Sequence, residues 1–274
     1  MRILNSLVSS LVGLGNGGVP TSSAPALKPP FISVGGFVSG GHGSQFYLPH
    51  PKKVVFFDDF LGDVVADQWN LVEGTDSSTT DASILAGGIG GILRFTSGDA
   101  GTGLAADLAQ MTQALQWQAS NGGLEIEVSL SLSRITNAYC FVGFTDVVTL
   151  EAPIISAASA DTFTTNATDA VGWMFDTRMS TDNWWLTGVA NDTDATHQNS
   201  GYAPVADTKE VLRVEVTKAG AATFFRNGIQ VGTVMTGALT PATDLTPTIA
   251  LGNTSGTSSF TMDVDYAYVA MDRS

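Results

Sequence analysis

Two pairs of acidic residues stand two positions apart, the spacing that could support acid–base chemistry. Glu125 and Glu127 form one pair, and Asp263 and Asp265 form the other. Glycoside hydrolysis needs two carboxylates roughly 5–9.5 Å apart, and residues i and i+2 of a strand lie about 7 Å apart. Each pair, however, alternates with apolar residues such as Ile126, which places the acids on the solvent side of a half-buried strand. The sequence therefore assigns no catalytic residue, and we expect a protein that is not an enzyme.

Metal and nucleophile chemistry have weaker signals. The run Asn191–Asp194 could offer oxygen ligands to calcium, but Asp and Asn also favour turns through local hydrogen bonds. The three histidines, His42, His50 and His197, have no Cys or Glu at ligand spacing. Cys140 lies between aromatic residues and fits a small core residue better than a reactive thiol. The sequence predicts neither a metal nor a cofactor.

Trp184 and Trp185 are adjacent in a β-type run, so one side chain should point inward and the other outward. An outward tryptophan is an interface anchor, a stacking platform for a sugar ring, or a side chain shielded under a loop. Nearby side chains could bind sugar hydroxyls. The resulting glycan-binding candidates are Trp184, Trp185, Asp182, Asn183 and Asn191.

The elements that would position these residues are strands. Residues 124–132 alternate apolar and polar side chains, which is typical of a strand with one buried face, and 139–145 is continuously apolar. Asn227-Gly228 between two apolar runs predicts a hairpin. Many short strands with turn signals predict a sandwich or barrel. Further strands are expected at 54–57, 91–96, 171–175, 184–189, 211–216, 222–225, 229–232, 248–251 and 260–269.

One segment fits two structures. Leu104, Leu108, Met111 and Leu115 recur at helical spacing, which favours an amphipathic helix over 104–118. Gly103 and the turn at 121–123 fit a pair of extended strands equally well. Both interpretations remain open at this stage.

The chain divides near residue 53. The first 53 residues carry four basic and no acidic side chains, whereas the remainder carries 8 basic and 26 acidic ones, a net charge of −18. Gly and Pro punctuate residues 1–53, yet apolar anchors are spaced along them, which favours an extended arm that becomes ordered on another molecule. The alternative is an arm folded back on its own domain. The interface candidates are Arg2, Leu7, Leu11, Lys28, Phe31, Phe37, Phe46, Tyr47, Lys52 and Lys53.

Overall composition excludes some partners. The net charge of −14 disfavours nucleic acid, which needs a basic footprint. A single cysteine excludes an internal disulfide, and no apolar run is long enough to cross a membrane. Residues 3–14 are moderately apolar, but Asn5, Ser6, Ser9 and Ser10 interrupt them, so we expect no signal peptide.

Seven parts of the sequence together carry a resemblance to a known family: Asp58–Asp63, Trp69, Gly91–Asp99, Asn121–Glu125, Phe224–Gly232, Asn253 and Met262–Tyr266. They resemble the concanavalin A-like virion proteins of tailed bacteriophages. The resemblance covers roughly residues 54–272. It implies an all-β fold, a concanavalin A-like jelly-roll β-sandwich at 54–274. The extended, irregular arm at 1–53, which is expected from composition, falls outside the resemblance.

The resemblance also implies a function. It points to a capsid decoration (cement) protein that binds the outside of the head shell, with the major capsid protein and further copies of itself as partners, most simply in a homotrimer. Its location would be the capsid surface, after assembly in the host cytoplasm. The alternative is a carbohydrate-binding module that attaches the virion to host glycans. Related glucanases carry a Glu-x-Asp-x-x-Glu strand, from which Glu125–Leu130 departs at the second and third acids.

Overall fold

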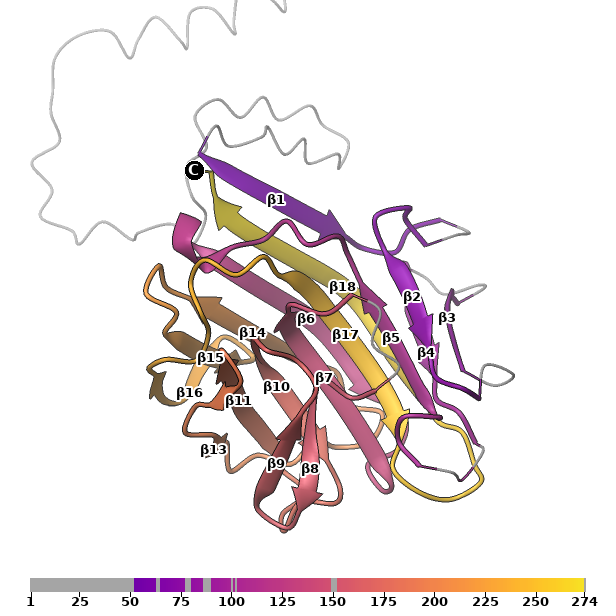
Figure 1. The fold of residues 1–274 in the computed structure, drawn as a ribbon. Helices are drawn as coiled ribbons and strands as arrows, with labels where there is room; N and C mark the ends of the chain where they lie inside the picture. The colour runs from indigo at the N-terminus through magenta and orange to yellow at the C-terminus, as the bar shows by residue number, and fades with distance from the viewer. Residues whose placement is uncertain are drawn as a thin grey trace, which may run out of the picture. The chain divides into compact units, whose positions relative to one another are not determined.

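The computed structural model describes residues 52–62, 65–76, 80–85, 90–99, 101, 103–148 and 152–273. The chain separates into two units, Met1–Leu48 and Pro49–Ser274. The fold below belongs to the second unit, which Figure 1 shows as two layers of antiparallel strands. The expected all-β jelly-roll sandwich is confirmed.

Eight strands form each of the two large sheets, here called sheet A and sheet B. Sheet A runs in the order β16 (Ile229–Met235), β15 (Ala222–Arg226), β14 (Glu210–Val216), β6 (Leu124–Leu132), β18 (Thr261–Asp272), β4 (Leu93–Thr96), β3 (Asp81–Ile84), with β1 (Lys53–Asp58) also paired to β18. Sheet B runs in the order β12 (Thr193–Asp194), β11 (Trp184–Ala190), β10 (Ala170–Asp176), β7 (Ala138–Thr145), β17 (Thr246–Asn253), β5 (Leu108–Thr112), β2 (Asn70–Glu73), with β13 (Gln198–Asn199) also paired to β11. A separate hairpin consists of β8 (Ile155–Ser159) and β9 (Thr162–Thr165), and a short 3₁₀ turn spans η1 (Ala119–Asn121).

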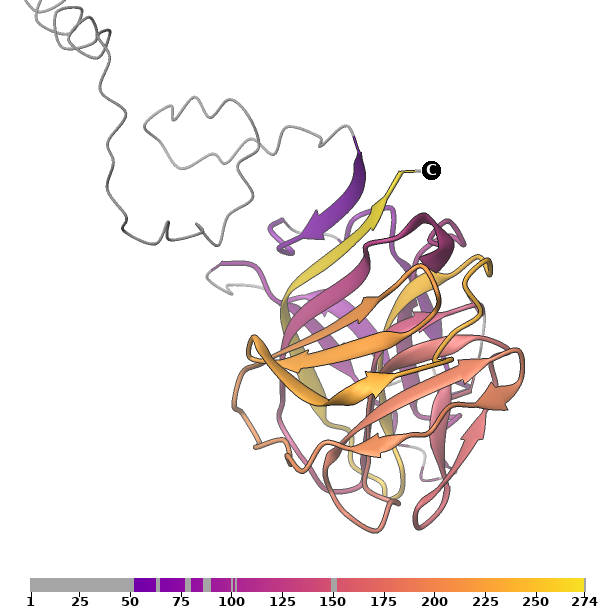
Figure 2. The ribbon, with the colours of Figure 1, turned by 90° about the vertical axis from the view of Figure 1, so that its left-hand side faces the viewer.

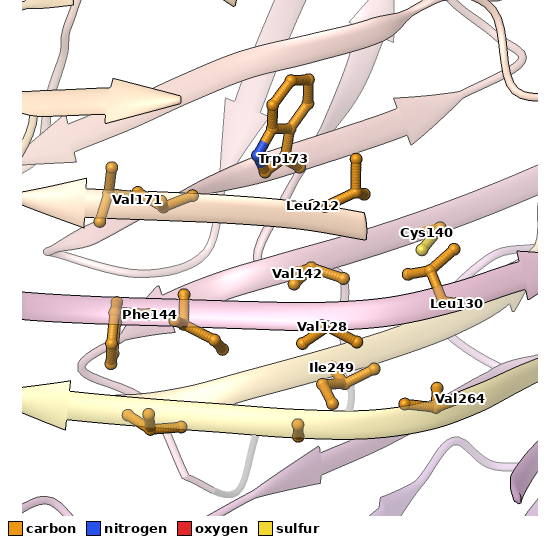
Figure 3. Packing of buried hydrophobic residues seen from close by; sticks show 14 of the residues in the cluster. Val128, Leu130, Cys140, Val142, Phe144, Val171, Trp173, Leu212, Ile249 and Val264 are labelled. Carbon is orange, nitrogen blue, oxygen red and sulfur yellow. The ribbon is translucent and has the colours of Figure 1, made fainter. Parts of the chain in front are cut away.

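The main core fills the space between the sheets. In β6 and β14 the buried residues alternate with half-exposed ones, so each strand presents one apolar face to the interior. Val128 and Leu130 of sheet A meet Cys140 and Val142 of sheet B in this layer (Figure 3). Trp173 of β10 also donates an indole hydrogen bond across the core to the carbonyl of Arg213, at 3.0 Å. This bond fixes β14 relative to sheet B.

The outer face of sheet B is covered. A second apolar cluster forms there, in which Ile155 and Ala157 of β8 join Phe141, Met174 and Trp185 of the sheet. The β8–β9 hairpin is also held by polar contacts, because the Tyr139 hydroxyl donates to the carbonyl of Ile155 at 3.0 Å. Since both faces of β7 and β10 are buried, their sequences are apolar up to the last residue of each strand, Thr145 in β7 and Asp176 in β10.

The segment at 104–118 is resolved in favour of extended structure. Leu108–Thr112 forms β5, which lies between β2 and β17, and Trp117 makes an isolated bridge to Leu245. Its helical spacing was misleading because β5 is buried on both faces, and a strand with two buried faces carries no period of two.

The predicted hairpin at Asn227-Gly228 is present. Both residues have positive φ, 51° and 77°, as a two-residue turn between twisted strands requires. The hairpin leads into β16, which is an edge strand of sheet A. Gln198 of β13 bonds the main chain of that strand at Thr233, accepting from its N–H at 2.9 Å and donating to its carbonyl at 3.1 Å.

Candidate functional site

The outer face of sheet A gathers charged and aromatic side chains from five strands. Strand register places Tyr268 of β18 opposite Glu127 of β6, Glu127 opposite Arg213 of β14, and Arg213 opposite Phe225 of β15. Opposite residues in antiparallel strands share a face, so these four side chains form a row across the sheet. Glu125 and Glu215, which face each other, flank the row.

Arg213 is the centre of this arrangement. Its guanidinium lies 3.5 Å from Glu125, 3.9 Å from Glu127 and 3.3 Å from Glu215. The same group stacks over the ring of Phe225, 4.2 Å from the ring centroid. Three carboxylates therefore share one guanidinium, which leaves the centre of the face negatively charged.

The surroundings shift two pKa values at this face. Partial burial, together with the charges of Glu215 and Glu127, raises the pKa of Glu125 above its usual value although Arg213 opposes the shift. Tyr266 of β18 donates its hydroxyl to Glu127 at 2.7 Å. Burial and this hydrogen bond to a carboxylate raise the pKa of Tyr266, so its hydroxyl stays protonated and remains a donor.

Aromatic rings lie at the β1 end of the face. Phe57 of β1 is 44% exposed and pairs with Tyr268 across the strands. Its ring centroid lies 5.9 Å from that of Tyr266, with the two planes only 32° apart. We call the set Phe57, Tyr266, Tyr268, Glu125, Glu127, Arg213, Glu215 and Phe225 the aromatic–carboxylate face.

Sequence reasoning found only part of this face. The alternation at 124–132 correctly placed Glu125 and Glu127 on the solvent side, where both are half-exposed. Their partner Arg213 was missed because it lies on a strand far away in the chain. The alternation at 211–216 indicates which face Arg213 occupies, but it does not indicate that β14 lies beside β6.

The other acid pair is divided by an irregularity. The register of β18 shifts between Val264 and Tyr266, so Asp263 lies before the shift, opposite Ser131, whereas Asp265 lies within it. Asp263 forms a two-bonded pair with Arg94, at 2.7 and 2.8 Å. Asp265 pairs with Lys209 at 3.1 Å.

The predicted glycan site at the tryptophans requires correction. Trp184 is fully buried in the main core and donates its indole N–H to Glu210 at 3.1 Å. Trp185 points to the opposite side, as expected, but is only 8% exposed because Phe163 of the β8–β9 hairpin packs against it. Neither ring can stack on a sugar, and the interpretation of Trp185 as a side chain shielded under a loop is the correct one.

The polar members of that site are not brought together. Asn183 bonds Asn199 at 2.9 Å near the start of β11, beside the exposed Asp182. Asn191 follows the other end of β11, eight residues after Asn183 and so about 26 Å away along the strand. These residues do not form one site.

Most interface candidates lie outside the described residues. They are Arg2, Leu7, Leu11, Lys28, Phe31, Phe37, Phe46 and Tyr47. Of the two that are described, Lys52 is exposed, and Lys53 begins β1 and pairs with Asp272 at 3.7 Å. The prediction that residues 1–53 form an assembly arm stays a prediction.

Other chemistry-bearing groups are isolated. Within the described ranges, no three His, Cys, Asp or Glu side chains gather as a metal site would require. Asn191 and Asp192 instead form an exposed turn with positive φ. Cys140 is buried in the core, and this burial raises the pKa of its thiol. In the part of the chain that the structure describes, no helix is long and apolar enough to span a membrane.

Comparisons with known proteins agree on the architecture. No family model matches the chain, and no curated protein matches it. The β-glucanase of Bacillus licheniformis superposes with a TM-score of 0.54 at 11% identity, over 78% of this chain and 97% of that one. The carbohydrate recognition domain of Emp47p gives 0.52 at 10% identity, over 81% and 98%. The laminarinase catalytic domain from Thermotoga petrophila RKU-1 gives 0.51 at 13% identity, over 80% and 97%.

The chain has a concanavalin A-like jelly-roll fold. At this level of identity the three structures establish the fold and nothing finer, so the resemblance to virion proteins in particular is left as a proposal. They do correct one expectation. The prediction that the chain is not an enzyme is wrong, because the structures similar to it include a β-glucanase and a laminarinase. The jelly-roll fold is one that supports glycoside hydrolysis.

Proposed function

We propose that the chain is a structural protein of a bacteriophage virion, a decoration protein that binds the outer surface of the head. The sequence resemblance at residues 54–272 and the two-part charge distribution support this proposal. A basic segment with spaced apolar residues would bind the major capsid protein, and the acidic jelly-roll would project outward.

One structural observation carries the proposal furthest. The segment enters the sandwich through β1, and all six residues of β1 are in register with β18, the 12-residue strand of sheet A. β1 lies beside β18 (Figure 2), and β18 is paired with β6 on its other side, so β1 is joined to an interior strand of sheet A. Phe56 of β1 also packs edge-to-face on Trp69, with centroids 5.5 Å apart. A tether joined in this way transmits load along a hydrogen-bonded ladder, which suits a protein held on a shell by its N-terminal segment.

Deletion of residues 1–45 tests the proposal. The remaining chain keeps every described strand and both apolar clusters, so we expect a folded sandwich with a β-sheet circular dichroism spectrum and a cooperative unfolding transition. Co-sedimentation with purified heads from the phage that encodes the chain should fall to background. Full retention of head binding by the shortened protein would contradict the proposal, as would the absence of the chain from purified particles.

Carbohydrate recognition is the second candidate function. Two observations favour it: one similar structure is named a carbohydrate recognition domain, and sheet A presents aromatic rings beside hydrogen-bonding groups on its open face. On a virion this activity would serve attachment to host glycans. Retardation of the full-length protein in native gels that contain soluble polysaccharides is the direct test.

A further inference from the structure

We propose that the aromatic–carboxylate face of sheet A is a binding site for a neutral polysaccharide chain. The proposal rests on carbohydrate recognition, the second candidate function, and it assigns that function to a place in the fold. The predicted site at Trp184 and Trp185 is buried, whereas this face lies on the other sheet and is accessible.

The accessibility of the face is the first step. Its side chains are half-exposed or exposed, and their neighbours in the same strands are buried in the core. Sheet B differs, because the β8–β9 hairpin packs over its outer face. Of the two sheet faces that point outward, sheet A therefore presents the open one among the described residues.

Preorganisation is the second step. Arg213 is held by three glutamates and by the ring of Phe225, and its carbonyl accepts the indole hydrogen bond from Trp173 in the core. Tyr266 is oriented by its bond to Glu127. A ligand that binds these groups does not have to order them first, so less binding free energy is lost to side-chain entropy.

The chemistry of the ligand follows from the kinds of group present. Phe57 is 44% exposed and packs against Tyr266 with the two ring planes 32° apart, so it offers apolar surface against which the apolar face of a sugar ring packs. The carboxylates of Glu127 and Glu215 accept hydrogen bonds from hydroxyl groups, and Arg213 donates them. The row from Tyr268 to Phe225 spans three strand spacings, about 14 Å, which is long enough for a few consecutive sugar rings.

Charge narrows the class of glycan. Three glutamates with one arginine leave the centre negative, in a domain that is itself acidic. The negative charge would repel a sulfated or uronic-acid polysaccharide, whereas a neutral polysaccharide would meet no such electrostatic repulsion. The face should therefore select neutral over anionic polysaccharides.

The experiment uses the full-length chain in native affinity gels. The probes are mixed-linkage β-glucan, galactomannan and dextran, together with a carboxymethylated form of the β-glucan. We expect retardation by at least one neutral probe and none by the carboxymethylated one. Phe57→Ala and Glu215→Gln should each weaken that binding at least tenfold, and both are surface changes that leave the core intact.

Tyr202→Ala is the matched control, because Tyr202 is a comparably exposed aromatic residue, 48% accessible, that is not part of this face. It should bind like the unmodified protein. If the unmodified, folded protein is retarded by no neutral probe, carbohydrate recognition itself fails. If it is retarded but Phe57→Ala and Glu215→Gln have no effect, the function stands and the site is wrong. Stronger retardation by the carboxymethylated probe would overturn the selection for neutral chains.

Discussion

The carboxylate of Asp176 accepts a hydrogen bond from the main-chain N–H of Ala157 at 2.9 Å and so ties β10 to the β8–β9 hairpin. The same carboxylate pairs with Arg178 at 2.6 Å and is completely buried. Sequence alone marks Asp176 only as the end of an apolar run. In the structure it anchors the hairpin that covers sheet B.

Asp176→Asn should loosen this hairpin. The substitution removes the charge that Arg178 and Ala157 both bind, and we expect a loss of about 2 kcal/mol in the free energy of unfolding. Limited proteolysis should cut within residues 155–165 several times faster than in the unmodified protein. Asp182→Asn, in an exposed loop, is the control and should change neither value. An equally protected hairpin in Asp176→Asn would show that apolar packing alone holds it.

Glu210→Ala should be among the most destabilising changes in sheet A. Glu210 is only 2% exposed, accepts two bonds from Arg226 at 2.8 and 3.0 Å, and accepts the indole N–H of Trp184. Its removal takes the carboxylate partner from the Arg226 guanidinium and leaves the buried indole N–H of Trp184 without its acceptor, at a cost of about 3–5 kcal/mol. Urea unfolding, monitored by tryptophan fluorescence, measures this loss in the free energy of unfolding. Glu215→Ala, on the exposed side of the neighbouring ion network, should cost under about 1 kcal/mol, and equal losses for the two variants would contradict the account.

Acid should weaken the packing around His197. Its ring lies 4.1 Å from that of Phe163, and burial lowers its pKa below the usual 6.5, although Gly188 and Asp194 oppose the shift. The unfolded chain therefore takes up the proton first as pH falls, so His197 contributes stability above about pH 6.5 that is lost toward its lower folded-state pKa. Comparison of urea midpoints at pH 7 and pH 5 should show a smaller decrease for His197→Gln than for the unmodified protein. Identical decreases would exclude His197 as the cause.

Cys140 should be inert in the folded protein. It is completely buried between the sheets, and the raised pKa of its thiol leaves almost no thiolate at neutral pH. Ellman's reagent should label no thiol in buffer and one thiol per chain in concentrated urea. Rapid labelling without denaturant would mean that the core opens readily at β7.

The fold could be predicted from the sequence because its signals are local. The alternation at Leu124–Leu132 and the turn at Asn227-Gly228 correspond to β6 and to the β15–β16 hairpin. The β8–β9 hairpin was not predicted, because its strands are only five and four residues long and consist mostly of Ser, Thr and Ala, which do not distinguish them from a loop. Trp185 was misassigned for the same reason: its burial depends on this hairpin.

The candidate site was less predictable because it depends on contacts between distant segments. Arg213 and Glu127 are separated in the chain by the seven strands β7 to β13 and meet only through the pairing of β6 with β14. The ring pair of Phe57 and Tyr266 needs the first and last strands to be neighbours. Nothing in the local pattern of either strand specifies its partner.

Gln198 has a consequence for solubility at high local concentration. Its side-chain amide satisfies both main-chain groups of Thr233 on the outermost strand of sheet A. Exposed edge strands of neighbouring copies can pair with each other at high local concentration, and they do so through main-chain N–H and C=O groups of this kind. By occupying them, one glutamine helps to keep closely spaced copies from joining into a continuous sheet, so each can remain a separate molecule on a densely populated surface.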